Sequence, residues 1–266
     1  MYNFSFHRPT TVRQAAGLLS RNPEGKLLAG GHSLIPVMKQ RLAQPSALID
    51  LSMVEGLAGV EQKGRSVVIG AMTRHADAAN SPVLQQAIPG LAMVPNSIGD
   101  PQVRNRGTIG GSLANSDPAA DYPAAVIALG ATIRTDRREI AADDYFKGVF
   151  ETALAPGELI REVVFPRPTR AAYSKLPHPA SRYAVVGVFV ADFAGQVRVG
   201  VTGAGPCAFR PAAVEAALTA RFEASALDGI AIDASRFNSD LHASAEYRGA
   251  MVLEMARRAV AAAQAA

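Results

Sequence analysis

RNRGTIGGSLANSDPAAD, residues 104–121, is the stretch of sequence that says most about the fold. Gly107, Gly110 and Gly111 lie within five residues here, with Thr, Ser and Asn side chains close by. A tight glycine turn can direct successive backbone N–H groups into one concavity that binds an anion, and neighbouring hydroxyl and amide groups can add hydrogen bonds to phosphate oxygens. Taken alone, the run is equally compatible with an ordinary glycine turn that opens a helix.

A second stretch of the same kind lies earlier in the chain. AGGHSLIPVMK, residues 29–39, places Gly30 and Gly31 before Ser33 and follows the apolar pair Leu27–Leu28. The pattern predicts a strand, a glycine turn and then a short helix or tight loop. Two phosphate-sized sites in one chain suggest a diphosphate held between two lobes. Neither stretch has the GxGxxG or GxxxxGK(S/T) spacing, so a Rossmann or P-loop site is not predicted.

The composition is that of a globular chain. Hydrophobic residues make up 48% of the 266 residues, which is enough for two or three compact units with buried cores. The net charge is +4, but Lys and Arg are spread along the chain and only 6% of the residues are aromatic. The sequence therefore does not indicate a nucleic-acid interface.

Cys207 is the only cysteine in the sequence. A single cysteine excludes an intrachain disulfide, and it also excludes an all-cysteine metal site or iron–sulfur cluster held by this chain alone. No apolar segment approaches the roughly 20 residues that span a bilayer, and the start, MYNFSFHRPTT, is too polar for a secretory leader. We therefore expect a cytoplasmic protein.

The apolar pattern predicts an α+β fold whose first part has two lobes. Residues 1–57 combine short strands with a helix over residues 10–19 and form the first lobe. Residues 58–168 form the second lobe, with buried strands and helices. Residues 95–101 within it are rich in turn-forming residues.

The best domain boundary lies at Pro166, Pro168 and Thr169. Beyond it, residues 169–266 are expected to form a third unit. Two apolar strands joined by a turn at residues 192–195 predict a hairpin, and two amphipathic helices are predicted over residues 211–220 and 244–265. This unit is therefore a small antiparallel sheet with a helical layer.

Several familiar catalytic arrangements are missing from the sequence. The five histidines have neither HxxxH nor HExxH spacing, so no metal site is predicted. There is no Gly-x-Ser-x-Gly motif. Asp143 and Asp144 are adjacent, so their side chains diverge, and a solvated turn is favoured over an acid/base pair.

AGGHSLIPVMK and NRGTIGGSLANSDPAADYPA together resemble the FAD-binding (medium) subunits of molybdenum hydroxylases of the xanthine dehydrogenase / carbon monoxide dehydrogenase family. The similarity is strongest in these two motifs and runs along nearly all of the chain. It implies a two-lobed PCMH-type FAD-binding domain, followed by a C-terminal domain like that of the carbon monoxide dehydrogenase flavoproteins.

The resemblance implies that two glycine loops hold the FAD diphosphate. We name residues 29–34 the first glycine loop and residues 108–112 the second. In the family the first loop wraps the diphosphate, and the backbone of the second completes the site. The implied FAD-binding residues of the two loops are Ala29, Gly30, Gly31, His32, Ser33, Leu34, Thr108, Ile109, Gly110, Gly111 and Ser112.

His32 has several interpretations. It could be a loop residue that hydrogen-bonds its neighbours, a catalytic base, a metal ligand or a neighbour of the flavin. In the wider flavin family a histidine after two glycines often carries FAD covalently. The molybdenum-hydroxylase branch, which this sequence follows, generally binds FAD non-covalently.

The resemblance also implies roles outside the loops. Asp121 matches a carboxylate near the sugar-alcohol part of FAD, and Ile160 matches an apolar position whose backbone approaches the flavin or adenine region. The two catalytic candidates are Lys175, whose positive charge would stabilise a reduced, anionic flavin, and Tyr183, which would stand against one face of the isoalloxazine ring as a gate. Tyr183 could instead be a plain strand residue at a domain interface. Some relatives have arginine in place of His178 and an acidic residue in place of Arg182, and these departures leave the flavin's re-oxidation partner or the shape of its entrance open.

By resemblance, the chain is the FAD-binding electron-transfer subunit of a heterotrimeric hydroxylase, expected as a dimer of heterotrimers. A large molybdopterin-binding subunit would oxidise the substrate, and a small subunit with two [2Fe–2S] clusters would relay electrons to FAD and on to an external acceptor. A chain with one cysteine leaves those clusters to a partner. Two alternatives stay open: a self-contained flavin oxidase or dehydrogenase, and a non-catalytic nucleotide-binding or assembly protein.

Overall fold

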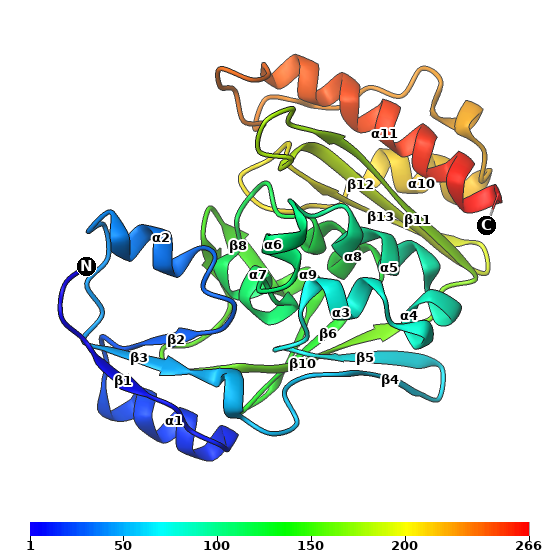
Figure 1. Ribbon diagram of the computed structural model, residues 1–266. Helices are drawn as coiled ribbons and strands as arrows, with labels where there is room; N and C mark the ends of the chain where they lie inside the picture. The colour runs from blue at the N-terminus through cyan, green and yellow to red at the C-terminus, as the bar shows by residue number, and fades with distance from the viewer. Residues whose placement is uncertain (266) are drawn as a thin grey trace.

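The computed structural model describes residues 1–265, and its N-terminal part is a small parallel α/β lobe at one end of the molecule (Figure 1). The strands are arranged in the order β1-β3-β2. Helix α1 begins after Thr11, whose hydroxyl accepts a hydrogen bond from Gln14 N–H at 3.2 Å, and it packs Ala15 and Leu19 into the core beneath β3. The elements are β1 (Ser5–His7), α1 (Val12–Arg21), β2 (Lys26–Leu28), α2 (Leu34–Lys39), β3 (Ala47–Asp50) and the 3₁₀ turn η1 (Leu51–Met53).

The middle of the chain forms an antiparallel sheet with the order β4-β5-β10-β6-β7. Its central strand, β10 (Ile160–Pro166), comes last in the sequence and pairs with both β5 and β6. The end of this segment therefore lies between two strands from its earlier part. The other strands are β4 (Val60–Lys63), β5 (Ser66–Gly70), β6 (Thr132–Thr135) and β7 (Glu139–Ala141), with a separate small hairpin of β8 (Phe146–Gly148) and β9 (Glu151–Thr152).

Short helices cover this sheet. All seven residues of α8 are buried, which explains its continuous apolar sequence YPAAVIA. Four of the helices have proline at their first or second position, where the missing N–H costs nothing: α4, α5, α6 and α8. The helices are α3 (His75–Ala79), α4 (Pro82–Ala87), α5 (Pro89–Asn96), α6 (Pro101–Arg104), α7 (Ile109–Asn115), α8 (Tyr122–Ala128) and α9 (Ala142–Tyr145).

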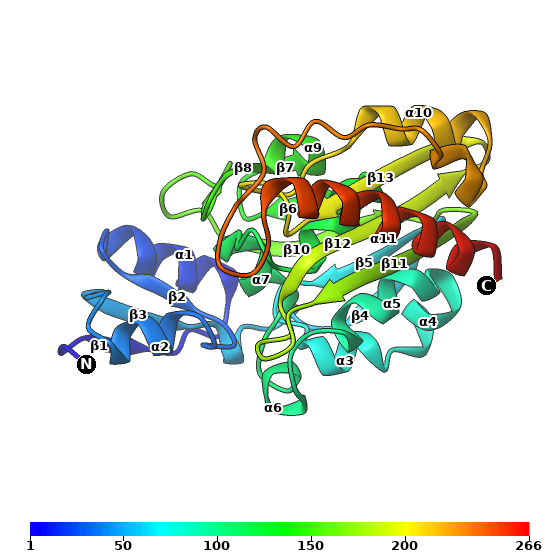
Figure 2. The same cartoon turned by 90° about the horizontal axis from the view of Figure 1, so that it is seen from above.

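The C-terminal sheet has the order β11-β12-β13 and is covered on both faces. Its elements are β11 (Arg170–Pro177), β12 (Ala184–Phe193), β13 (Gln196–Thr202), α10 (Ala212–Ala220), η2 (Ala224–Leu227) and α11 (Ala245–Ala265). Helix α11 lies along one face (Figure 2), and α5 and α8 of the middle segment contact the sheet as well. Alternation along β12 divides it between two cores: Val188 and Val190 belong to the core with α11, whereas Phe189 and Ala191 belong to the core with α8.

The predicted hairpin is confirmed, as are the two C-terminal helices. β12 and β13 pair up to Phe193 and Gln196, and the two turn residues, Ala194 and Gly195, both have positive φ, as in a type I′ turn. The expectation of a turn over residues 95–101 is only partly right, because α5 continues through Pro95 and its turn begins at Ser97. Strand β11 was not expected as a separate strand, since its sequence, RAAYSKLP, lacks clear alternation.

Candidate functional site

A cavity of about 1130 Å³ lies between the N-terminal lobe, the middle segment and the turn that joins β11 to β12. Its lining runs from the end of α1 and from β2, past both glycine loops, to residues 154–160 and 181–183. Ligand pockets usually measure about 300–1,000 Å³. This one is therefore large enough for an elongated ligand of dinucleotide size.

The first glycine loop offers free hydrogen-bond donors to this cavity. Within residues 1–265, the backbone N–H groups of residues 30–34 have no hydrogen-bond acceptor. Gly31 has φ of +78°, which a residue with a side chain rarely adopts, and its carbonyl accepts from Ile35 N–H at 3.0 Å as α2 begins. Because every residue of this loop lines the cavity, the loop suits an anionic ligand such as a diphosphate.

The second glycine loop differs from the expected anion-binding turn. It opens helix α7 with Thr108 as N-cap, and the N–H groups of residues 109–112 already have acceptors inside the protein. These bonds run from Ile109 to Thr73 O (3.2 Å), Gly110 to Ala71 O (2.8 Å), Gly111 to Thr108 Oγ1 (3.1 Å) and Ser112 to Thr108 O (3.0 Å). The idea of a nest of free backbone donors is therefore wrong for this loop.

Close backbone approach explains the glycines instead. A Cβ atom on Gly30 would lie 2.2 Å from the carbonyl oxygen of Arg106, just before the second loop. A Cβ on Gly110 would lie 2.7 Å from the carbonyl oxygen of Ala71. The first loop thus lies directly against the backbone that leads into the second loop, and the two loops form adjoining walls of the cavity.

Asp121 lies at the cavity wall in a buried polar cluster. Its carboxylate accepts a hydrogen bond from Tyr173 OH at 2.6 Å and pairs with the Lys175 ammonium at 2.8 Å. Lys175 also donates to Ser97 O at 3.1 Å. Burial raises the pKa of Asp121, and the positive charge of Lys175 opposes that rise. The cluster fixes the carboxylate in place while one edge of the residue still faces the cavity.

Tyr183 lies at the rim of the cavity. It is 50% exposed and belongs to the turn between β11 and β12, together with Ser181 and Arg182, which also line the cavity. Desolvation raises the pKa of its phenol, and the negative charges of Asp117 and Asp121 add to this. Its exposure and position are those required of a side chain that controls access.

The structure brings most of the predicted site residues to this one cavity, Ile160 and Gly111 included. Two do not line it. The side chain of Ile109 is fully buried in the core, and Lys175 points to Asp121 and Ser97. Their predicted relation to a bound cofactor is therefore indirect: Ile109 holds the loop, and Lys175 acts through Asp121.

His75 is a cavity residue that sequence reasoning missed. It is 5% exposed, and its Nδ1 has no hydrogen-bond partner among residues 1–265, nor does the nearby Tyr122 hydroxyl. Desolvation, with further contributions from His32 and Arg104, lowers the pKa of His75 to about 4. The imidazole is therefore neutral at pH 7. The backbone N–H of His75 donates to the carbonyl oxygen of Gly107, just before the second glycine loop, at 2.9 Å. No spacing in the sequence indicates that His75 lies next to this loop.

His75→Phe is expected to flatten the pH dependence of stability. The unfolded chain binds a proton at His75 near pH 6.5, whereas the folded chain does so only near pH 4. Native stability therefore falls as the pH drops from 6.5 to 4, by up to about 3 kcal/mol from this residue. Urea unfolding at pH 7 and pH 5 should show a smaller difference for the variant, and an equal difference in both proteins would contradict the assignment.

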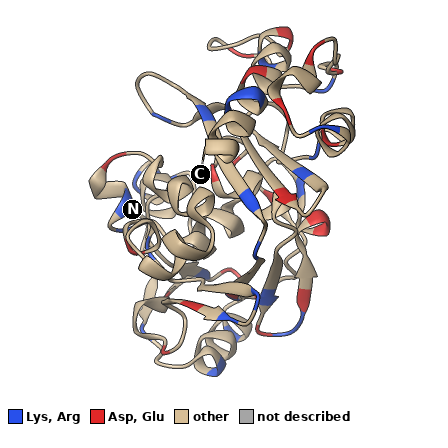
Figure 3. Ribbon diagram, turned by 90° about the vertical axis from the view of Figure 1, so that its right-hand side faces the viewer, with Lys and Arg blue, Asp and Glu red and all other residues tan. Residues whose placement is uncertain are grey.

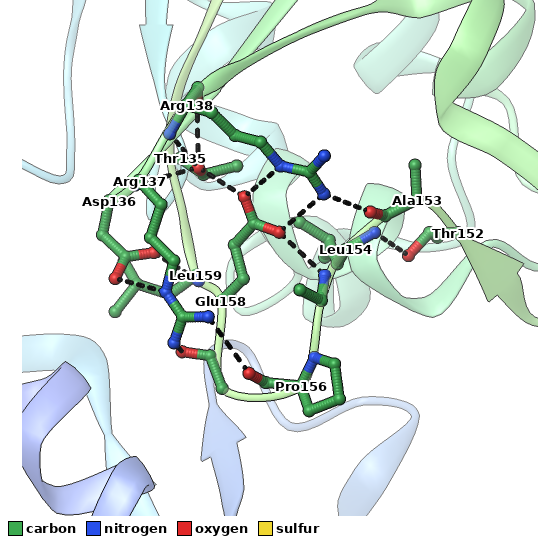
Figure 4. Close-up of polar contacts among 12 residues, drawn as sticks. Thr135, Asp136, Arg137, Arg138, Thr152, Ala153, Leu154, Pro156, Glu158 and Leu159 are labelled. Carbon is green, nitrogen blue, oxygen red and sulfur yellow. Dashed lines mark hydrogen bonds and ion pairs between the residues drawn. The ribbon is translucent and has the colours of Figure 1, made fainter.

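A second missed feature is the network that holds the cavity loop of residues 154–160 (Figure 4). The Glu158 carboxylate accepts from Thr135 Oγ1 at 2.7 Å, from Ala155 N–H at 2.7 Å and from Arg138 Nε and Nη2 at 3.0 Å each. Next to it, Arg137 donates to Gly157 O at 2.7 Å. Hydrogen bonds from Arg138, Ala155 and Thr135 lower the pKa of Glu158 to about 2, although burial opposes them.

Glu158→Gln is expected to lower the free energy of unfolding by about 2 kcal/mol at pH 7, because several bonds to a charged acceptor are weakened or lost. The carboxylate stabilises the fold above its ordinary pKa of 4.5, and this contribution fades as the pH falls towards 2. The variant should lack that acid-dependent loss in urea titrations. Glu139→Gln is a matched control, since Glu139 is 62% exposed and its surface ion pair contributes little.

Charges of both signs are interspersed over the molecule (Figure 3). Among residues 1–265, no helix combines the length and apolar character needed to cross a bilayer. The same part of the chain contains no group of three His, Cys, Asp or Glu residues placed to hold a metal ion. The volume of the cavity, about 1130 Å³, favours a large organic ligand.

Comparison with known proteins gives a consistent result. The family described as "FAD binding domain in molybdopterin dehydrogenase" matches residues 2–168. The carbon monoxide dehydrogenase medium chain of Hydrogenophaga pseudoflava is 38% identical, over 98% of this chain and 96% of that protein. The nicotine 6-hydroxylase medium subunit of Paenarthrobacter nicotinovorans is also 38% identical, over 95% of this chain and 94% of that protein.

Solved structures agree with the sequence relatives. A chain of reconstituted CO dehydrogenase from Oligotropha carboxidovorans superposes with a TM-score of 0.91 at 36% identity, covering 99% of this chain and 98% of that chain. A chain of the Hydrogenophaga pseudoflava enzyme gives a TM-score of 0.89 at 37% identity, with coverage of 99% and 98%. The expected α+β fold is therefore confirmed along essentially the whole chain.

Proposed function

This chain belongs to the FAD-binding subunits of the molybdenum hydroxylases, and from that premise we propose that it takes electrons from a [2Fe–2S] partner subunit and passes them to an external acceptor. The observation that carries the proposal is the cavity itself, with free backbone donors on one wall and a half-exposed tyrosine at its rim. FAD, when bound there, supplies the capacity to accept and release electrons singly or in pairs.

The residues present fit non-covalent FAD. The N–H groups of residues 30–34 would bind its diphosphate, and the second glycine loop would shape the adjoining wall because Gly30 of the first loop leaves room for the backbone just before it. Asp121 retains acceptor capacity for ligand hydroxyl groups beyond its bonds to Tyr173 and Lys175. Ile160 would supply apolar contact.

The remaining site residues control charge and access. Lys175 brings a positive charge close to the cavity wall through Asp121, which favours a ligand that gains negative charge. Tyr183 limits which molecules reach the inner end of the cavity. His32 lies in the loop with its side chain exposed, and we assign it a loop role without covalent attachment.

The whole enzyme would contain two further kinds of subunit. A single cysteine leaves the iron–sulfur clusters to a small partner chain, and a large chain would hold the molybdopterin cofactor and select the substrate. Relatives named for carbon monoxide and for nicotine are equally similar to this chain, so its sequence does not specify that substrate. We propose a cytoplasmic dimer of heterotrimers, with domains at residues 1–57, 58–168 and 169–266 in this subunit.

The proposal is tested by purifying the tagged full-length chain from its native host and recording the absorption spectrum of the complex. Flavin and iron–sulfur bands, together with one larger and one smaller co-purifying chain, are expected. Stopped-flow mixing of the dithionite-reduced complex with an acceptor dye should then show flavin re-oxidation. A lone yellow chain that is reduced directly by a small substrate would favour a self-contained flavoenzyme, and a colourless chain that still binds partners would favour an assembly protein.

A further inference from the structure

The turn that carries Tyr183 is held together by one histidine. His178 N–H donates to Tyr183 O at 2.8 Å, and His178 O accepts from Arg182 N–H at 2.9 Å. Its Nδ1 accepts from the N–H groups of Ala180 and Ser181, at 3.2 Å each. Both the backbone and the side chain of His178 thus fix the geometry of a turn whose last three residues line the cavity.

A second histidine completes the arrangement from a distant part of the sequence. His178 Nε2 lies 3.2 Å from Nδ1 of His242, and the two rings meet edge to face with centroids 4.3 Å apart. Because Nδ1 of His178 accepts two N–H bonds, its proton is on Nε2, and Nδ1 of His242 must be the acceptor. The contact therefore requires both imidazoles to be neutral.

His242 is itself anchored to the C-terminal unit. Its N–H donates to Asp240 Oδ1 at 2.9 Å, and Asp240 Oδ2 pairs with Arg248 at 2.7 Å. Arg248 is buried and donates to the carbonyl groups of Val185 and Gly203, at 2.6 and 2.9 Å. The first turn of α11, which contains Arg248, is thereby connected through Asp240 and His242 to the turn at the cavity.

We propose that His178 and His242 are positioning residues that hold Tyr183 at the rim of the cavity, and that they release it when either imidazole is protonated. The inference rests on the proposed function, because Tyr183 matters only if a flavin lies in the cavity. A proton on Nδ1 of His178 would face the N–H groups of Ala180 and Ser181, and a proton on Nδ1 of His242 would face His178 Nε2–H. Either change turns an attractive contact into a repulsive one.

The charged and titratable neighbours of the pair come from three elements. Arg182 and Tyr183 belong to the same turn, and Asp117 lies in the loop after α7, near enough to act on the Tyr183 phenol. Asp240 and Arg248 stand behind His242 and are bonded to each other. Imidazole is the side-chain group whose charge ordinarily changes between pH 5 and 8, and the test covers pH values within that range.

The test uses the full-length chain loaded with FAD, and FAD affinity is measured first. Dithionite-reduced protein is then mixed with ferricyanide at pH 5.5 to 8, and the re-oxidation rate is recorded by stopped flow. We expect the rate to differ at least threefold between the two ends of the range in the native protein. His178→Ala should give the acid value at every pH, because the turn is released throughout.

Two conservative variants separate positioning from a merely structural role. His178→Asn places an acceptor oxygen where Nδ1 stands and cannot be protonated, so it should keep the native pH 8 rate down to pH 5.5. Tyr183→Ala should remove the pH dependence as well, since the pair acts through that ring. Leu241→Ala is the matched control, because Leu241 is fully exposed beside His242.

The outcomes distinguish the two proposals. If the native chain binds no FAD, the proposed function fails. If FAD binds normally but the pH profiles of the native protein, His178→Asn and His178→Ala coincide, the proposed function stands and the positioning role of the pair is overturned.

Discussion

Lys175→Met is expected to lower the free energy of unfolding by about 3–5 kcal/mol at pH 8, the largest stability effect expected from a single substitution in this site. The change leaves the Asp121 carboxylate buried, 4% exposed, with only the Tyr173 hydroxyl as a side-chain partner. Urea unfolding monitored by circular dichroism measures the loss directly. The same substitution removes the positive charge beside the cavity.

The pH dependence of that variant identifies the cause. Without Lys175, nothing offsets the burial that raises the pKa of Asp121, so the folded protein binds a proton at a higher pH than the unfolded chain. Relative to the native protein, the stability of the variant should therefore increase as the pH falls from 8 to 5. Asp121→Asn combined with Lys175→Met removes both charges and should recover most of the loss. A variant as stable as the native protein at every pH would show that the pair contributes little.

Gly30→Ala is expected to weaken FAD binding by about 100-fold or more, which corresponds to about 2.7 kcal/mol. The new methyl group would overlap the Arg106 carbonyl oxygen, at 2.2 Å, so the first glycine loop must move away from the second. Overpacking of this kind usually costs about 1–3 kcal/mol of stability, so the chain should still fold. Fluorescence titration with FAD measures the affinity.

Gly17→Ala is the matched control for that experiment. Gly17 lies in α1 of the same lobe, where a Cβ atom has ordinary contacts at 3.5 Å. Alanine in a helix interior should raise stability by up to about 1 kcal/mol and leave FAD affinity unchanged. Equal FAD affinity in Gly30→Ala and the native chain would mean that the close contact between the first loop and Arg106 does not shape the site.

The features predicted correctly from the sequence are those encoded locally. The two glycine loops can be recognised from their glycine-rich composition, and the hairpin turn at Ala194–Gly195 is defined by adjacent residues. The joining of both loops at one cavity followed from their shared chemistry and from the family resemblance. These features do not depend on which distant strand pairs with which.

The features that were missed depend on long-range pairing. Thr73 and Ala71 accept the N–H groups that the second glycine loop was expected to leave free, and only the fold brings them there. Asp143 is exposed, as expected, but its ion pair with Arg198 of β13 at 2.8 Å was not predicted. The partners of Glu158 likewise come from β6, from the turn between β6 and β7, and from the loop just before Glu158. No periodicity in the sequence marks such contacts.

Strand β12 has a consequence for how relatives of this chain can be recombined. Its side chains alternate between a core shared with α11 and a core shared with α8, and α8 lies before the boundary near residue 168. A chimera joined at that boundary would therefore bring together two halves of a hydrophobic core that had not evolved as a pair. A successful exchange must transfer α8 together with the C-terminal sheet. The segment that has to be exchanged as a whole is therefore larger than the C-terminal domain marked by the boundary near residue 168.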